Sequence, residues 1–338
     1  MSDKDNLQNG EIIYPALAHI VLRNPKNKRM KPIGTAFVIS MLDPNRMLLM
    51  TARHNLSWAS EIDSKPPKSA VTSLFSVPTP YKKTIGEPDG YEWLVMINRV
   101  VDFSDKEEVI SHAIEAEIFE AYSSEYTDIA YIKAVSKIPI GEWQHLNETL
   151  HTAMPAEGTK VSAIGFHRTA DLTGYIECEE FPSGEGEIRN ALWFATSMSN
   201  GVVEAVYPNG KNHIGWPCFQ VSFPFHSGMS GGPVVTIQDG KTVCCGVICS
   251  SRTRGDGSIE DSVASALWPS LMTPIQETGY SFTLREGPPG PAKGRVLGLI
   301  QDGHIRDVSD APQSLKVAID PMAMFFGRGE GFHLSWNA

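Results

Sequence analysis

Short apolar runs bounded by polar turns recur along most of the chain. In the first fifty residues, three such runs alternate with polar stretches, at 16–22, 34–39 and 47–50. Apolar runs of this length between turn residues are typical of β-strands. The N-terminal part of the chain therefore predicts an antiparallel meander.

The second half of the chain repeats this pattern, with runs at 160–166, 219–223, 234–237, 242–245 and 262–267. The dipeptide Asp239-Gly240 separates two of these runs, and it is a strong signal for a two-residue β-hairpin turn. Residues 268–277 follow the last run and predict a short closing helix. The pattern as a whole favours an all-β protein.

One segment between these halves shows a different period. Residues 104–107 match a helix capping box, and Ile110, Ile114 and Ile118 recur at helical spacing among acidic residues. The sequence therefore predicts a helix over 105–122, within an insert at 65–122. A packing element on the surface of a barrel is favoured over a lid at a cleft.

The C-terminal part begins with a Gly- and Pro-rich stretch at 287–291, which is typical of a stiff linker. Beyond it, apolar residues flank a second Asp-Gly turn at Asp302 and Gly303. About 50 residues are few for an independent domain. We therefore expect 280–338 to be a strand-rich appendage folded on the preceding unit rather than a free binding module.

Composition narrows the class of protein. Of the 338 residues, 41% are hydrophobic and 20% are charged, and no apolar run reaches the roughly 20 residues of a membrane helix. The net charge of −10 disfavours a nucleic-acid partner, since phosphates require a basic face. We expect neither a membrane nor a nucleic acid to be a partner.

Cysteine usage and the N-terminal residues favour a cytoplasmic location. The first residues lack the basic and apolar regions of a secretory signal. The five cysteines are an odd number without the spacing of a disulfide framework or a zinc site. A metal site built from His145, His151 and His167 also lacks ligand spacing, so no metal is expected.

The segment Gly228-Met229-Ser230-Gly231-Gly232 presents one hydroxyl among glycines that let other groups approach closely. A serine becomes a good nucleophile only beside a general base that a third group orients. Upstream, His54 directly follows an apolar run, and Asp128 directly precedes another. The three candidates occur in the order His, Asp, Ser.

This order and these flanking residues resemble the chymotrypsin-like (trypsin-fold) serine peptidases, and the match covers about 34–275. The resemblance implies two six-stranded antiparallel β-barrels of trypsin-like type. Residues 1–150 would form the N-terminal barrel with His54 and Asp128, and 151–279 the C-terminal barrel with Ser230. The helical insert and the C-terminal appendage would be additions to this fold.

The resemblance also implies the chemistry. His54 would be the general base, Asp128 would orient it, and Ser230 would attack a peptide carbonyl to form an acyl-enzyme. The backbone N–H groups of Gly228 and Ser230 would form the oxyanion hole. No cofactor is implied, and a specific intracellular protein or peptide is the expected substrate. The alternative is a trypsin-fold module that binds or scaffolds a peptide without turnover.

For substrate preference, the resemblance places an uncharged set of side chains around the residue before the cut: Pro224, Phe225, Cys249, Ser250 and Ser251. Trypsin carries an aspartate at the position of Pro224, so a preference for Arg or Lys loses its partner. Apolar or small residues are the remaining default, although His226 could add a polar preference.

The resemblance also bears on activation. In trypsin an aspartate precedes the serine and pairs with a newly released N-terminus, whereas this chain has Met229 at that position. We therefore expect no activation by N-terminal cleavage. Any control would act through the insert, the appendage, or a regulatory ligand or partner.

Overall fold

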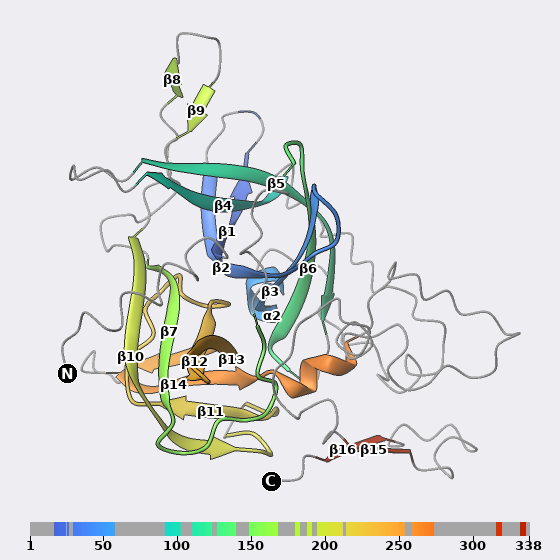
Figure 1. Ribbon diagram of the computed structural model, residues 1–338, viewed down its shortest axis with the longest axis vertical. Coiled ribbons are helices and arrows are strands. Elements are labelled where there is room, and N and C mark those ends of the chain that lie inside the picture. The colour runs from blue at the N-terminus through green and yellow to red at the C-terminus, as the bar shows by residue number, and fades with distance from the viewer. Residues whose placement is uncertain are drawn as a thin grey trace, which may run out of the picture.

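The computed structural model describes residues 17–24, 26, 30–57, 92–102, 110–123, 127–139, 149–167, 180–182, 188–190, 195–211, 214–253, 259–273, 316–319 and 332–335. Within these residues the chain forms two closed β-barrels (Figure 1). The helix α2 (Arg53–Ser57) lies in the figure between the blue-green barrel and the yellow-orange barrel.

The first barrel has six antiparallel strands: β1 (Leu17–Arg23), β2 (Met30–Met41), β3 (Arg46–Ala52), β4 (Glu92–Asp102), β5 (Ile110–Ser123) and β6 (Ile129–Ser136). Their order is β1-β2-β3-β6-β5-β4, and pairing of β4 with β1 closes the barrel. Its interior is apolar, with Val38, Leu49 and Ile132 fully buried in one cluster. Burying these side chains stabilises the barrel because apolar surface leaves water.

The second barrel also has six antiparallel strands: β7 (Lys160–His167), β10 (Ala195–Tyr207), β11 (Cys218–Val221), β12 (Pro233–Gln238), β13 (Lys241–Thr253) and β14 (Ile259–Ala266). Their order is β10-β11-β14-β13-β12-β7. The predicted hairpin joins β12 to β13, with positive φ at Asp239 (51°) and Gly240 (73°). Positive φ at both positions is the geometry that the Asp-Gly dipeptide favours.

Two small sheets lie outside the barrels. One pairs β8 (Glu180–Pro182) with β9 (Ile188–Asn190), and the other pairs β15 (Lys316–Ile319) with β16 (Phe332–Ser335). The hairpin expected around Asp302 and Gly303 lies outside the described residues.

The prediction of an all-β fold with two six-stranded barrels is confirmed. The predicted helix over 105–122 is wrong, because Ile110–Ser123 is strand β5 and pairs with β4 and β6. A spacing of four between isoleucines fits one face of a helix, but it also fits alternate positions of a strand. Strands β4 and β5 complete the first barrel, so 92–102 and 110–123 are not part of an insert.

A shared apolar cluster joins the two barrels. Phe37 and Met50 from the first barrel belong to the same buried cluster as Ile164 and Val247 from the second. The 3₁₀ helix η3 (Trp268–Met272), at the start of the predicted closing helix, adds apolar side chains to this cluster. No helix in the described parts of the chain is long and apolar enough to span a membrane.

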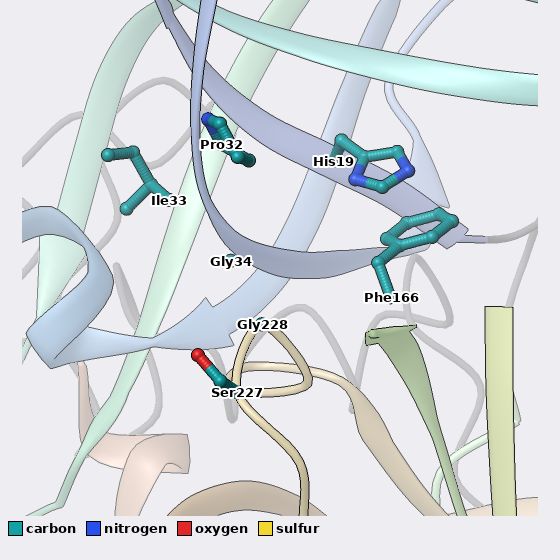
Figure 2. A pocket seen from close by; sticks show the side chains of 7 residues that line it. All are labelled: His19, Pro32, Ile33, Gly34, Phe166, Ser227 and Gly228. Atoms are coloured by element: carbon teal, nitrogen blue, oxygen red, sulfur yellow. The ribbon is translucent and has the colours of Figure 1, made fainter. Parts of the chain in front are cut away.

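A buried histidine also lies at the barrel junction. The ring of His19 in β1 stacks on the ring of Phe166 in β7, with an angle of 21° between the ring planes (Figure 2). Burial lowers the pKa of His19 well below its usual value of 6.5, because the charged form loses its hydration. The native protein therefore holds His19 in its neutral form at neutral pH.

This burial predicts a pH dependence of stability. Below about pH 6.5 the unfolded chain binds a proton at His19 that the native protein does not, so the free energy of unfolding falls as pH decreases. The contribution of His19 to this slope reaches about 1.4 kcal/mol per pH unit. We expect the free energy of unfolding of His19→Gln to depend less steeply on pH than that of the wild type. Denaturant titrations between about pH 4.5 and 7.5, a range that brackets the pKa of an ordinary histidine, measure this dependence.

The matched control is His151→Gln, which changes a histidine that is only partly buried. The pH dependence of its free energy of unfolding should follow that of the wild type. An equal pH dependence for His19→Gln and the wild type would contradict a neutral buried His19.

Candidate active site

The topology of the first barrel brings His54 and Asp128 together. His54 lies in α2 (Arg53–Ser57), which begins directly after β3, and Asp128 lies directly before β6. Strands β3 and β6 are antiparallel neighbours, and Ala52 at the end of β3 pairs with Ile129 at the start of β6. The residues that follow and precede this pair therefore emerge at the same edge of the barrel.

The Asp128 carboxylate contacts His54 through both of its oxygens. His54 Nδ1 lies 2.7 Å from Oδ2, and the His54 backbone N–H donates to Oδ1 at 3.0 Å. An ionised carboxylate only accepts hydrogen bonds, so Nδ1 carries a proton and Nε2 of the neutral ring has the lone pair. The Asp128 side chain is 6% exposed and that of His54 is 43% exposed. This is the arrangement of an oriented general base.

The loop between β11 and β12 places Ser230 against the first barrel. The backbone N–H of Thr35 in β2 donates to the Ser230 carbonyl at 2.9 Å, and the Asn55 side chain donates to the same oxygen at 2.8 Å. Asn55 is the residue after His54 in α2. The same helical turn thus carries the candidate base and holds the backbone of the candidate nucleophile.

A third residue completes this set, which we call the Ser230 clamp: Thr35, Thr51 and Asn55. The Thr51 hydroxyl accepts from the Asn55 side chain at 3.1 Å and donates to the Thr35 carbonyl at 2.7 Å. All three residues are buried. These three residues were not among the site residues predicted from the sequence, although Thr35 lies in the glycine-containing run and Asn55 follows His54.

The Thr35 side chain also fixes the start of the Ser230 loop. Its hydroxyl donates to the Gly228 carbonyl at 2.9 Å and accepts from the Phe166 backbone N–H at 3.0 Å. One hydroxyl of the first barrel thus contacts two segments of the second barrel. The position of Gly228 relative to β2 depends on this contact.

The glycines beside Ser230 have backbone conformations that other residues rarely adopt. Gly228 has φ of 94° and Gly231 has φ of 87°. A Cβ at Gly231 would also collide with the Thr35 carbonyl and the Thr51 hydroxyl. Glycine at Gly231 therefore permits both the turn and its close approach to the clamp.

The backbone N–H groups of this loop fall into two sets. Those of Met229, Gly231 and Gly232 donate to backbone carbonyls within the second barrel. Among the described residues, no backbone carbonyl accepts from the N–H of Gly228 or of Ser230. Two N–H groups without such acceptors, beside a serine, could stabilise an oxyanion.

The five expected substrate-contacting residues differ in exposure. Pro224 and Ser250 are partly exposed, and Ser251 is exposed. Phe225 is 5% exposed and belongs to an apolar cluster inside the second barrel, and the Cys249 thiol donates to Asp128 Oδ2 at 3.1 Å. The last two side chains thus face the interior, and none of the five carries a charge.

Met229, directly before Ser230, is also fully buried in the apolar cluster of the second barrel. Its sulfur accepts from the His226 backbone N–H at 3.4 Å. The side chain is uncharged, so an ion pair at this position is impossible.

A small cavity borders this site at the barrel junction (Figure 2), and its lining residues are His19, Pro32, Ile33, Gly34, Phe166, Ser227 and Gly228. It opens beside one of the two candidate oxyanion donors. In the described segments of the chain, no group of three His, Cys, Asp or Glu residues is arranged to hold a metal ion.

Comparisons with known proteins identify the family of this chain. A family model described as a trypsin-like peptidase domain matches residues 34–244, more than half of the chain. No curated protein matches the sequence. The solved protease domain of MamO from Magnetospirillum magneticum, in its apo form, is similar with a TM-score of 0.42 and 13% identity over 76% of this chain and 95% of that one.

The Ser230 clamp leads to a prediction for Asn55→Ala. Removal of the amide leaves the Ser230 carbonyl with one donor fewer, and the free energy of unfolding should fall by about 1–3 kcal/mol. The reaction of Ser230 with a fluorophosphonate should also slow, because the loop loses a contact to the helix of His54. Denaturant titration and labelling kinetics measure the two effects.

The matched control is Asn45→Ala, which removes an amide that donates to the Ser136 carbonyl at 3.0 Å in a turn of the first barrel. Its labelling rate should equal that of the wild type. If both variants label at the wild-type rate, the clamp has no part in placing Ser230.

Proposed function

Because the chain belongs to the trypsin-like peptidase domain family, we propose that it is a serine endopeptidase with His54, Asp128 and Ser230 as its catalytic triad. The observation that carries this proposal is the contact of 2.7 Å between His54 Nδ1 and Asp128, made in the helix that also holds the Ser230 carbonyl through Asn55. The proposed base, orienting group and nucleophile thus meet at one junction between the barrels.

In the proposed reaction, His54 Nε2 accepts the Ser230 hydroxyl proton as the oxygen attacks a peptide carbonyl. The negative charge that develops on the carbonyl oxygen is stabilised by the N–H groups of Gly228 and Ser230. The imidazolium then gives its proton to the leaving amine, and an acyl-enzyme forms. Water, deprotonated by His54, hydrolyses this ester and restores Ser230.

Asp128 contributes by position and charge. Its buried carboxylate holds the tautomer with the Nδ1 proton and stabilises the imidazolium that forms in the transition state. Each oxyanion donor typically contributes about 3 kcal/mol to lowering the barrier. The chemistry uses no metal ion and no organic cofactor.

The proposal extends to location and control. Four cysteines in the described residues are buried thiols, which suits a reducing cytoplasm, and we place the specific protein substrate there. Met229 is buried among apolar side chains, so the competent loop does not depend on a new N-terminus paired at that position. Control through a ligand or a partner is the remaining route.

The test of the proposed function is a comparison of new peptide N-termini in a proteome treated with wild type, Ser230→Ala and His54→Ala. Wild type should release peptides that both variants fail to release. The double variant should be no slower than either single variant, since the two residues act as one unit. Peptidase activity retained by Ser230→Ala would remove Ser230 as the nucleophile, and wild-type inactivity would favour a binding module.

The same cleavage profile tests substrate preference. We expect Leu, Phe, Met, Val or Ala before the cut, because Pro224, Ser250 and Ser251 offer no charge to pair with Arg, Lys or Glu. Burial of an unpaired charge costs several kcal/mol, about enough to exclude such residues. A profile dominated by Arg or Lys would contradict this preference.

A further inference from the structure

One edge of strand β13 has no partner strand beyond Ile248 within the described residues. Strand β12 pairs with β13 only as far as Val247, and the loop of Ser230 continues this side through backbone hydrogen bonds with Ile248. From Ser250 onward, β13 pairs with β14 alone. An open strand edge of this kind can bind an extended peptide as an added strand, through main-chain hydrogen bonds.

The position of Ser230 sets the direction and the register of such a peptide. The chain of β13 leads away from the Ser230 loop, whereas a substrate chain leads toward Ser230 up to the bond that is cut. The two therefore run antiparallel, and each residue upstream of the cut advances one residue along β13, about 3.3 Å. Counting from Ile248, which contacts the Ser230 loop, the residue before the cut would lie beside Cys249 and the fourth residue upstream beside Arg252.

The side chain of Arg252 is exposed at this position of β13. Arg252 lies directly opposite Asp261 in β14, and residues that are directly opposite in antiparallel strands direct their side chains to the same face. The fourth upstream residue of an added strand, opposite Arg252 on the other edge, would direct its side chain to this face as well. A cation would therefore stand beside that side chain.

The carboxylate of Asp261 also faces a second cation. Lys211 Nζ lies 2.8 Å from Asp261 Oδ2, and the two side chains are 16% and 10% exposed. The same ammonium donates to Gln220 Oε1 at 2.6 Å and lies 5.3 Å from the centre of the Tyr207 ring, so its charge is held in place. Two cations thus share one carboxylate, and the face around Arg252 carries an excess of positive charge.

Two further charged groups bear on this excess. The Arg53 guanidinium carbon lies 5.8 Å from the centre of the Trp216 ring, and the Trp216 indole donates to Ser265 in β14 at 3.1 Å, so Arg53 adds positive charge on the β14 side. Glu204 is in β10, which lies three strands from β13 in the sheet, about 14 Å away. Water and salt screen most of the effect of Glu204 over that distance.

The sign of this local charge is opposite to that of the whole protein, which has a net charge of −10. Most of the surface would therefore repel an acidic segment, and the region around Arg252 would attract one. A local charge of this kind selects which segment binds and in which register more than it raises the affinity.

We propose that Arg252 selects an acidic side chain at the fourth position upstream of the cut. The substrates are then extended protein segments with Glu or Asp at that position and an apolar residue directly before the cut. The proposal rests on the proposed function, because upstream positions are defined only relative to a bond that Ser230 attacks. Arg252 is a specificity-determining residue, since it pairs with a substrate side chain and takes no part in the bond-breaking steps.

The experiment uses internally quenched peptides that are identical except at the fourth position upstream of the cut, which holds Glu, Gln or Lys. We expect kcat/KM of the wild type to be about fivefold higher for the Glu peptide than for the Lys peptide, with the Gln peptide between them, because an exposed ion pair is weak. Salt at about 0.5 M should reduce this difference, since exposed charges are screened. Arg252→Glu should reverse the order of the three peptides, and Arg252→Lys should keep it.

The matched control is Lys241→Glu, which makes the same change of charge at the opposite end of β13. Lys241 is exposed and lies in the hairpin with β12. Its variant should keep the wild-type order of the three peptides. Equal kcat/KM values for the three peptides in the wild type, or an Arg252→Glu variant that still prefers the Glu peptide, would overturn the proposal.

A binding measurement separates this inference from the proposed function. Fluorescence anisotropy of the same peptides with Ser230→Ala should show tighter binding of the Glu peptide, and the added change Arg252→Glu should abolish this preference. That result with a wild type that cleaves no peptide would support the inference and leave the endopeptidase proposal without support. Equal cleavage of all three peptides would overturn the inference alone, and the absence of both cleavage and charge-dependent binding would overturn both.

Discussion

Two hydrogen bonds to the carbonyl oxygen of Ser230 fix the position of its loop against the first barrel. Their donors are the backbone of Thr35 and the side chain of Asn55, which belong to the other barrel. Each such bond contributes only about 1 kcal/mol to net stability. Their importance is geometric, since they set the position of the Ser230 loop relative to the helix that carries His54.

The remaining features of the site follow from this junction. Gly231 must be glycine, because its positive φ and the nearness of Thr35 leave no room for a Cβ. Thr35 must carry a hydroxyl, because that hydroxyl contacts both Gly228 and Phe166. On the opposite side, Cys249 brings the second barrel against Asp128. Each barrel thus contacts a candidate catalytic residue of the other.

The sequence predicted the fold and the candidate site where the signal lies in residues that are close together along the chain. The strand runs and the Asp-Gly hairpin follow from residue patterns, and three short motifs in a fixed order indicated the triad candidates. The segment at 110–123 was misassigned because a four-residue spacing fits both a helix face and alternate strand positions. The clamp joins residues far apart in the sequence, such as Asn55 and Ser230, which are 175 positions apart, and no local pattern encodes such contacts.

The most direct test of the account is whether Ser230 is an activated nucleophile. Purified protein treated with a fluorophosphonate should gain the mass of one adduct, and peptide mapping should locate it on Ser230. His54→Ala should not react at an appreciable rate, because the hydroxyl would have lost its base. Absence of an adduct in the wild type, or equal labelling of wild type and His54→Ala, would contradict the central claim.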